Sequence, residues 1–322
     1  MRRGEEDNDS AKATSGGKDK RCEPNGASDQ SKPEWDPPPA TTVPLPPGLH
    51  LVATPIGNLA DVSLRALAVL RGADRIFCED TRVTRKLLAH YGIKAGLEPY
   101  HDHNAEVARP TILAALRRGE RVALVSDAGT PLISDPGYKL VRAALAEQLP
   151  VTAAPGPSAV LTALILSGLP PHPFLFAGFL PRQQGGRRKV LAGWASLEAT
   201  LIFYEAPPRL PAALADMVEI LGPRLAAVAR ELTKLHEEVR RGALSELAEH
   251  YRAEGPPRGE VVIVVGPPEP RPPLAEDEID DRLREAVAEM GVRDAAAKLA
   301  AETGLPRQAL YRRALAIRAG HR

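Results

Sequence analysis

The sequence predicts an α/β protein with two sheet domains facing each other across a cleft, followed by a small all-α domain. Three observations indicate this. Between residues 48 and 266, short apolar runs alternate with helix-length stretches. Proline-rich segments interrupt the chain before residue 48 and again near residue 270. A helical pattern then resumes up to the C-terminus. Repeated strand–helix alternation favours sheets with mainly parallel strands.

Composition restricts the class of protein. At roughly 100–200 residues per domain, 322 residues suggest two or three domains, and 43% hydrophobic residues suffice for a core. With 42 Lys and Arg against 41 Asp and Glu, the net charge of +1 excludes a uniformly basic nucleic-acid binder. Cys22 lies in a polar segment and Cys78 in an apolar run, which excludes a disulfide framework and fits a reducing cytoplasm.

The two proline-rich segments are predicted to lie outside the folded domains. Residues 1–47 hold seven Lys or Arg, nine Asp or Glu and eight prolines, which predicts a disordered tail without a secretory signal. Residues 267–275 are predicted to be a semi-rigid linker. The longest apolar stretch, Ala159–Leu169, is interrupted by Thr162 and Ser167 and is too short for a bilayer. We therefore expect a cytoplasmic protein with no membrane partner.

Each sheet domain is predicted to contain about four strands, with the first domain at residues 48–169 and the second at 170–266. Helices are expected over Asp61–Leu70, with Asp61 as N-cap, and over Glu106–Arg118, where apolar residues recur every three or four positions. The predicted strands are Leu49–Thr54, Arg75–Cys78, Arg121–Ser126, Pro150–Ala154, Phe174–Phe179, Thr200–Tyr204, Leu225–Ala229 and Glu260–Val265.

Three loops rich in glycine and proline follow strands of the first domain, at residues 53–58, 126–137 and 154–159. Open α/β sheets bind ligands at the carboxyl ends of their strands. Glycine lets backbone approach a ligand closely, and proline fixes the loop shape. Any one of these loops could be a simple tight turn, but three at equivalent positions favour a binding site.

The residues of these loops restrict the ligand. Neither a GxGxxG motif after the first strand nor a GxxxxGK[ST] motif is present in the sequence. Asp127 and Asp135 in the middle loop would repel a polyphosphate. Carboxylates accept hydrogen bonds from ribose hydroxyls and from an ammonium group. S-adenosylmethionine carries both groups, a sulfonium and no phosphate, so it is our candidate cofactor.

Eight segments, in order, carry a family resemblance: ATPIGNLADVSLRAL, CEDTR, YHDHN, ALVSDAGTPLISDPG, APGPSAVLTAL, GFLPR, IFYEAPPRL and ARELTKLHEE. Together they resemble the tetrapyrrole-methylase superfamily, and within it the bacterial enzymes that methylate the ribose 2'-oxygen of a cytidine in 16S rRNA. The resemblance covers about residues 48–266 and continues into the C-terminal segment, while residues 1–47 lie outside it.

The resemblance implies a tetrapyrrole-methylase-like two-domain fold, a deep cleft that binds folded S-adenosylmethionine, and a homodimer. It also implies methylation of cytidine 1402 in the decoding region of the 30S ribosomal subunit. By motif, the residues expected to bind the cofactor are Pro55, Gly57, Asn58, Asp127, Ala128, Gly129, Pro131, Ser134, Asp135, Ser158, Ala159, Tyr204, Glu205, Ala229, Glu231 and Leu232.

The implied reaction is in-line attack of a ribose 2'-oxygen on the sulfonium methyl, which depends largely on alignment. A base would assist, and the candidate catalytic residues are Asp80, His101 and His103. The two histidines could instead hold their loop in place. A third convincing ligand is missing and the family is metal-independent, so no metal is expected. Lys234 is a further candidate for a structural or RNA contact.

RNA binding requires local positive charge, and three basic clusters are candidates: Arg82, Arg85 and Lys86; Arg187, Arg188 and Lys189; and Arg307, Arg312 and Arg313. Any one cluster could be an ordinary solvated surface. The third lies in residues 276–322, where residues 294–315 read as helix, a turn at Gly304 and a second helix. That is a helix-turn-helix pattern, with its interface expected to include Leu299, Leu310 and Leu315.

Two other functions fit part of this pattern. A tetrapyrrole (precorrin or uroporphyrinogen) C-methyltransferase would share the fold. A helix-turn-helix regulator without enzymatic activity would use only the C-terminal domain, which could also be purely structural. The basic C-terminal domain and the EDTR, HDHN and SDAGTP strings favour the rRNA methyltransferase.

Overall fold

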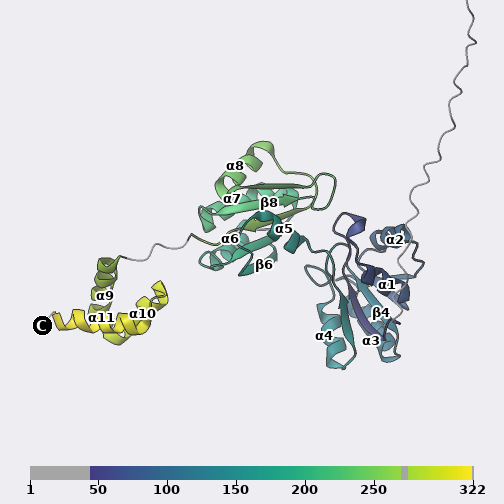
Figure 1. Cartoon of the computed structure of the whole chain (residues 1–322), viewed down its shortest axis with the longest axis horizontal. Coiled ribbons are helices and arrows are strands. Elements are labelled where there is room, and N and C mark those ends of the chain that lie inside the picture. The colour runs from purple at the N-terminus through teal and green to yellow at the C-terminus, as the bar shows by residue number, and fades with distance from the viewer. Residues whose placement is uncertain (1–43, 270–274, 321–322) are drawn as a thin grey trace, which may run out of the picture. The chain divides into compact units, whose positions relative to one another are not determined.

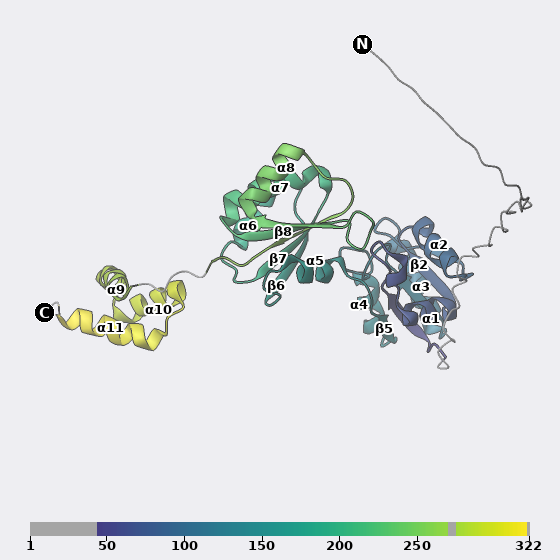
Figure 2. The same cartoon turned by 45° about the horizontal axis from the view of Figure 1, so that its top comes forward.

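The structure, a computed structural model, describes residues 44–269 and 275–320 (Figures 1 and 2). The predicted tail up to residue 43 and most of the predicted linker lie outside these ranges. In the part that is described, two five-stranded sheets are followed by a group of three helices. No helix within the described ranges is long and apolar enough to cross a membrane.

The first sheet is wholly parallel, as predicted, with strand order β3-β2-β4-β1-β5. Helices α1 and α2 cover one face and α3 and α4 the other, each burying aliphatic residues against the strands. The elements are β1 (Gly48–Val52), the 3-10 helix η1 (Leu59–Asp61), α1 (Leu64–Gly72), β2 (Arg75–Cys78), α2 (Thr81–His90), β3 (Leu97–Pro99), α3 (Ala105–Arg117), β4 (Arg121–Val125), α4 (Tyr138–Ala146) and β5 (Val151–Ala154).

The first helix begins later than predicted. Ser63, not Asp61, is its N-cap, and the Ser63 hydroxyl accepts a hydrogen bond from the Ala66 N–H at 3.0 Å. Asp61 is instead the last residue of η1. A hydroxyl at the N-cap satisfies one of the unpaired N–H groups of the first turn, so the SLRAL segment supplies its own start signal.

The second sheet is mixed, with strand order β6-β7-β10-β8-β9. Only β6 and β7 pair in parallel, whereas β10 pairs antiparallel with β7 and β8, and β8 pairs antiparallel with β9. The prediction of mainly parallel strands is therefore wrong for this sheet. Its strands are β6 (Phe174–Phe179), β7 (Thr200–Glu205), β8 (Leu225–Arg230), β9 (Glu238–Ala243) and β10 (Val261–Val265).

Helices cover both faces of the second sheet. Three of them, α6 (Gln184–Gly193), α7 (Leu210–Leu221) and α8 (Leu244–Glu254), form its larger core, and the 3-10 helix η2 (Pro207–Arg209) precedes α7. The opposite face is covered by α5 (Ala159–Ser167), whose Val160, Ala163 and Leu164 pack against strand residues such as Ile202 and Val264. This packing groups α5 with the second sheet, although the predicted domain division at residue 169 would group it with the first.

The C-terminal helices are α9 (Glu276–Met290), α10 (Val292–Thr303) and α11 (Arg307–Gly320). The predicted helix, turn and helix correspond to α10 and α11, with Gly304 left-handed at φ 71°. Helix α9 adds a third apolar face, and Leu283, Leu299 and Leu310 meet in the common core. Leu315, predicted to lie in the interface, is instead exposed.

Two leucines of the second sheet region allow a matched test of the core. Leu214 on α7 is fully buried, whereas Leu225 at the start of β8 is 66% exposed. We expect Leu214→Ala to lower the free energy of unfolding by about 2–5 kcal/mol, because it removes buried methyl groups and leaves a cavity. Leu225→Ala should cost less than about 1 kcal/mol. Urea unfolding of both variants measures the difference, and equal losses would contradict this core assignment.

Candidate active site

The three ligand-binding loops predicted for the first sheet are joined by hydrogen bonds at its carboxyl edge. Thr54 and Gly129 exchange two backbone hydrogen bonds of 2.9 and 3.1 Å, which tie the first loop to the middle loop. The Thr54 hydroxyl also donates to the Ser126 carbonyl at 2.9 Å. The Thr130 hydroxyl donates to the Pro157 carbonyl at 3.2 Å and so adds the third loop. These contacts hold the three loops as one surface.

The middle loop has an unusual backbone. Leu132 and Ser134 have φ values of 71° and 65°, in the left-handed region that residues with a Cβ rarely adopt. Such conformations cost roughly 1–2 kcal/mol per residue and cluster at functional sites. The Ser126 hydroxyl donates a hydrogen bond to the Asp135 carboxylate across the loop, which helps to hold this backbone in place.

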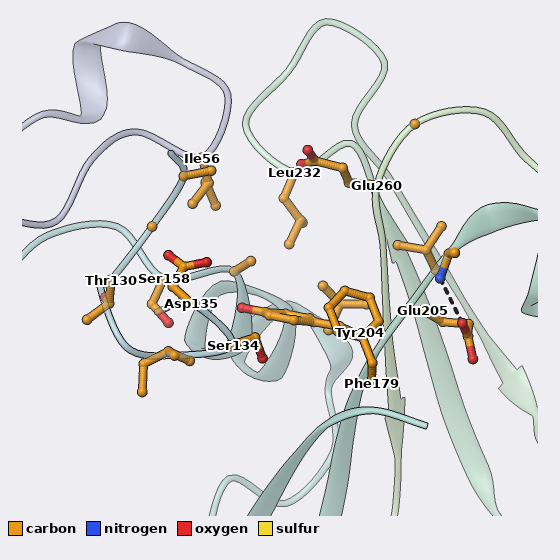
Figure 3. Close-up of a pocket in the computed structure, with 18 of the residues that line it drawn as sticks. Ile56, Thr130, Ser134, Asp135, Ser158, Phe179, Tyr204, Glu205, Leu232 and Glu260 are labelled. Atoms are coloured by element: carbon orange, nitrogen blue, oxygen red, sulfur yellow. Dashed lines mark hydrogen bonds between the residues drawn. The ribbon is translucent and has the colours of Figure 1, made fainter. Parts of the chain in front are cut away.

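A cavity of about 390 Å³, here called the main cavity, opens between these loops and the second sheet (Figure 3). Both sheets contribute to it, as the cleft prediction requires. Nine of the residues predicted to bind the cofactor line its wall: Ala128, Gly129, Ser134, Asp135, Ser158, Ala159, Tyr204, Glu205 and Leu232.

Sequence reasoning missed the other residues that line the main cavity. Phe179, at the end of β6, lies with its ring centroid 5.5 Å from that of Tyr204 (Figure 3). Both residues end strands that were predicted, so the strand-end rule could have found Phe179 if it had been applied to the second sheet. The missed residues are Ile56, Thr130, Ile133, Phe179, Ala206, Pro207, Gly259, Glu260, Val261 and Val262.

The wall of the main cavity is largely apolar, with two carboxylates, those of Asp135 and Glu260. Burial raises the pKa of Asp135, and burial together with Asp135 raises the pKa of Tyr204 to about 12. Tyr204 is thus a neutral phenol at physiological pH. Glu205 turns its carboxylate away from the cavity (Figure 3). This carboxylate accepts hydrogen bonds from the Ala206 N–H at 2.8 Å and from Arg209 at 3.0 Å. This wall suits a cationic ligand with a flat apolar part.

A second cavity of about 300 Å³, here called the side cavity, shares Ile56, Ala128 and Glu260 with the main cavity. Three residues predicted to bind the cofactor line this space instead: Pro55, Gly57 and Asp127. Its remaining wall comes from the first loop, α2, the middle loop and the segment after β8, and consists of Thr54, Leu59, Val83, Thr84, Lys86, Leu87, Ser126 and Lys234.

Glycine is required at position 57, between the side cavity and the segment after β8. A Cβ there would lie 2.4 Å from Lys234 Cγ and 3.0 Å from the Leu232 carbonyl oxygen. The neighbouring Asn58 N–H donates to the Thr233 hydroxyl at 3.0 Å. This close approach joins the first loop to the second sheet region, and it is the physical reason for the glycine in the first motif.

Four other residues predicted to bind the cofactor line neither cavity. The Asn58 side chain caps η1, and Pro131 lines a small space beside Glu79. Ala229 is buried within β8, and Glu231 forms an ion pair with Lys234 at 2.8 Å. These four residues thus lie outside the walls of the two cavities, and their contact with the cofactor stays a prediction.

The predicted catalytic residues also lie outside both cavities. Asp80 is the N-cap of α2, and its carboxylate accepts hydrogen bonds from the Arg82 N–H and guanidinium. These bonds lower the pKa of Asp80 to about 2, which makes it a weak base. The ring centroids of His101 and His103 are 6.0 Å apart, and the buried His101 Nδ1 has no hydrogen-bond partner among the residues that the structure describes. Across residues 44–269 and 275–320, no cluster of three or more potential ligands could hold a metal.

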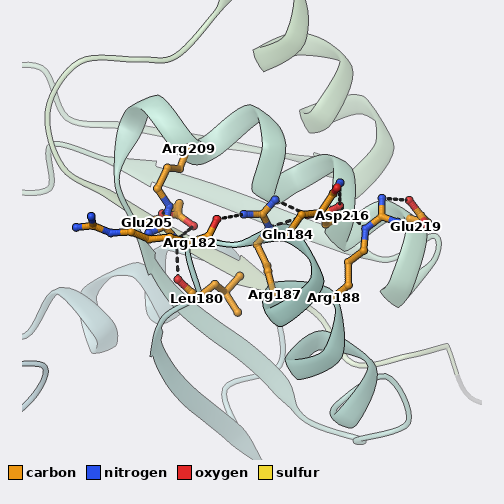
Figure 4. A network of polar contacts seen from close by, with 9 residues as sticks. All are labelled: Leu180, Arg182, Gln184, Arg187, Arg188, Glu205, Arg209, Asp216 and Glu219. Carbon is orange, nitrogen blue, oxygen red and sulfur yellow. Dashed lines mark hydrogen bonds and ion pairs between the residues drawn. The ribbon is translucent and has the colours of Figure 1, made fainter.

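The prediction that Arg187 contacts RNA is wrong. The residue is only 4% exposed, and its guanidinium pairs with the buried Asp216, with Nε 2.6 Å from Oδ2 (Figure 4). Arg188 also pairs with Asp216 at 2.7 Å and with Glu219 at 2.5 Å. Within this cluster Lys189 is exposed to solvent. The basic run is therefore partly an internal ion-pair network between α6 and α7.

A similar correction applies to Arg313 on α11. Its guanidinium pairs with Asp280 and Glu276 of α9, so it joins two helices and does not face outward. Arg307 and Arg312 are exposed, as are Arg82, Arg85 and Lys86 on α2. Glu276 and Asp280 at the start of α9 are thus neutralised by Arg313 from the same group of three helices.

Arg187 and Lys189 provide a paired test of these assignments. Arg187→Ala should lower the free energy of unfolding by about 3–5 kcal/mol, because it leaves the Asp216 charge buried with one partner fewer. Lys189→Ala should leave stability within about 0.5 kcal/mol. If Lys189 contacts a phosphate, the same variant should lower the salt slope of RNA affinity by about 0.7–0.9. Thermal unfolding and RNA binding at several salt concentrations measure both effects, and a stable Arg187→Ala protein would contradict the buried pair.

Two family profiles match the sequence. The profile described as Tetrapyrrole (Corrin/Porphyrin) Methylases matches residues 48–248, and the profile described as RsmI C-terminal HTH domain matches residues 273–318. Among solved structures, the methyltransferase CobJ is similar with a TM-score of 0.52 and 22% identity, covering 70% of this chain and 96% of that one. The structure of diphthine synthase is similar with a TM-score of 0.53 and 15% identity, covering 68% of this chain and 89% of that one. These structural similarities show the fold alone.

Curated relatives named Ribosomal RNA small subunit methyltransferase I are much more similar in sequence. The protein of Mesorhizobium japonicum is 53% identical over 276 residues, which is 85% of this chain and 94% of that protein. The protein of Erythrobacter litoralis is 54% identical over 277 residues, 85% and 97% of the two chains. The protein of Escherichia coli O157:H7 is 45% identical over 272 residues, which is 83% of this chain and 94% of that protein. With both profiles matched and these identities along most of its length, the chain belongs to the ribosomal RNA small subunit methyltransferase I family of tetrapyrrole methylases.

Proposed function

We propose that this protein transfers a methyl group from S-adenosylmethionine to the ribose 2'-oxygen of cytidine 1402 in 16S rRNA. Its family consists of small-subunit rRNA methyltransferases, and the chain is an S-adenosylmethionine-dependent enzyme of that kind. The observation that carries the proposal is the main cavity, whose apolar wall holds two carboxylates at the carboxyl edge of a parallel sheet. The exact nucleotide follows from the family.

The residues of the main cavity fit S-adenosylmethionine. Asp135 and Glu260 provide negative charge for its cationic groups and acceptors for its hydroxyls. Phe179, Tyr204 and Leu232 provide apolar surface for a flat ring. When bound, the cofactor supplies a methyl group on a good leaving group, so that alignment of the two reactants can account for much of the rate. Holding that alignment is the task of the interlocked loops, which hydrogen bonds keep in one conformation.

We extend the proposal to RNA contacts by exposed cations. Arg82, Arg85 and Lys86 lie on α2 beside the side cavity, and Lys86 lines it. Lys189, Arg307 and Arg312 are exposed elsewhere on the described surface. Contacts of this kind would bind the phosphates and set register without identifying bases.

We also propose that the enzyme acts as a homodimer in the cytoplasm, on 16S rRNA or on the assembled 30S subunit. Helix α5 supports the dimer, because Leu161 and Ile165 are 52% and 73% exposed while its other side packs on the second sheet. Two large aliphatic side chains one turn apart form a small apolar face, which is the kind of surface that a second copy would cover.

Transfer of labelled methyl from S-adenosylmethionine tests the function directly. The acceptors are 30S subunits that lack the modification, naked 16S rRNA and uroporphyrinogen. We expect label in RNA, recovered as 2'-O-methylcytidine after digestion, and the better RNA acceptor identifies the natural substrate. Label on uroporphyrinogen alone would overturn the rRNA function in favour of tetrapyrrole methylation.

Asp135 is expected to be important for cofactor affinity. Asp135→Asn removes a charge from the main cavity but keeps an oxygen that can accept from Ser126. We expect S-adenosylmethionine to bind roughly 10- to 100-fold more weakly, because a hydrogen bond to a charged group contributes about 1.5–3 kcal/mol. Calorimetric titration measures this affinity. The same chemical change at the exposed Asp277 of α9 is the control, and equal affinity in both variants would show that Asp135 does not contact the cofactor.

A further inference from the structure

We infer that the side cavity receives the acceptor nucleotide and that Asp127 takes the proton from its 2'-hydroxyl. The inference rests on the proposed function and deepens it, since it assigns a place to the RNA and a base to the reaction. None of the residues selected from sequence as bases lines either cavity, so this role needs another candidate.

The position of the side cavity supports this assignment. Its wall shares Ile56, Ala128 and Glu260 with the main cavity, so ligands in the two spaces would meet at a common boundary. Asp127 lines the side cavity directly before Ala128. A group transferred between two bound molecules must cross such a boundary, and a base for the receiving oxygen has to lie on the receiving side.

The size and charge of the side cavity suit one extruded nucleotide. About 300 Å³ is at the lower end of the range for ligand pockets. Enzymes that modify a base take its nucleotide out of the stack into such a pocket, and the same movement would bring this ribose to the methyl group. Lys86 from α2 and Lys234 from the segment after β8 line the space and could contact the flanking phosphates. Lys234 is held by Glu231 at 2.8 Å and Glu260 at 3.2 Å.

Only one of the two oxygens of the Asp127 carboxylate is hydrogen-bonded among the described residues. Its Oδ1 accepts a hydrogen bond of 2.9 Å from the Asp80 N–H, just before α2 begins. Among the described residues, Oδ2 has no hydrogen-bond partner and is left to receive a proton. Burial raises the pKa of Asp127, whereas the pKa of the neighbouring Asp80 is lowered to about 2 by its hydrogen bonds to Arg82. Of these two carboxylates, Asp127 is therefore the stronger base.

The other two carboxylates near the boundary between the main cavity and the side cavity already have hydrogen-bond or ion-pair partners. Asp135 accepts from the Ser126 hydroxyl, and Glu260 pairs with Lys234. The charged groups that surround Asp127 are Asp80 and Arg82 at the start of α2, the carboxylates of Glu79 and Asp135, and Lys86, Lys234 and Glu260 around the cavity.

In the proposed step the O–H bond of the 2'-hydroxyl breaks and its proton passes to Oδ2 of Asp127. The oxygen forms a bond to the methyl carbon, and the carbon–sulfur bond breaks with its electron pair remaining on sulfur. The products are the 2'-O-methylated nucleotide, neutral S-adenosylhomocysteine and protonated Asp127, which then releases its proton to solvent.

Single-turnover methyl transfer by Asp127→Asn tests the inference, because asparagine keeps the shape and an oxygen that can accept from the Asp80 N–H. We expect the rate to fall by about 10²- to 10⁴-fold, the usual contribution of a general base. The affinity for S-adenosylhomocysteine should stay within about twofold. The wild-type rate should rise with pH through the raised pKa of Asp127 and then level off, and this acid limb should be missing from the variant.

Matched variants separate the outcomes. Asp277→Asn on α9 should retain the wild-type rate and pH profile, whereas Lys86→Ala should raise the KM for RNA with little change in the saturated single-turnover rate. An Asp127→Asn rate within threefold of an active wild type would overturn the base assignment alone. Loss of S-adenosylhomocysteine binding in Asp127→Asn would overturn it by making Asp127 a cofactor contact. A wild type that methylates no RNA would overturn the proposed function together with this inference.

Discussion

The pair of backbone hydrogen bonds between Thr54 and Gly129 is the constraint on which the site depends. It closes the first loop against the middle loop, and the middle loop then contributes to both cavities. The Ser126 hydroxyl adds a bond to Asp135 and the Thr130 hydroxyl a bond to the Pro157 carbonyl, so the left-handed Leu132 and Ser134 lie in a segment that is fixed on both sides. Strained backbone persists only where the surroundings specify it in this way, and a preorganised site follows from that rigidity.

Much of the fold could be predicted because the buried strands are apolar and lie between helical patterns. All eight predicted strands are confirmed to within one or two residues at each end. The two missed strands lack that pattern, since β3 has only three residues and β9 reads EVRRGA, a polar strand at the edge of its sheet. Strand direction in the second sheet was also missed, because antiparallel pairing of β10 with β7 and β8 joins segments far apart in the chain. Local periodicity contains no information about such pairing.

The site could be predicted from sequence where its residues lie in short motifs at the ends of predicted strands. Glycine, proline and aspartate at strand ends identified the three loops, and Phe179 also ends a predicted strand. Glu260 directly precedes β10, so it reaches the main cavity through the antiparallel pairing of β10 with β7 and β8. The wrong assignment of Arg187 has a similar origin. A run of basic residues predicts a surface, but the buried Asp216 that pairs with two of these arginines lies on α7, nearly thirty residues further along the chain.

The distribution of charge explains how an acidic site can serve a polyanionic substrate. Carboxylates line both cavities, with Asp135 in the main cavity, Asp127 in the side cavity and the exposed Glu260 in both, while Lys86 and Lys234 also line the side cavity. Phosphates are attracted to cations and repelled by carboxylates, so the RNA backbone would be held beside the lysines. The neutral ribose hydroxyl and the cationic donor can enter the acidic interior without that repulsion. Opposite charges in neighbouring positions thus orient the acceptor, with its phosphates outward and its 2'-oxygen toward the methyl group.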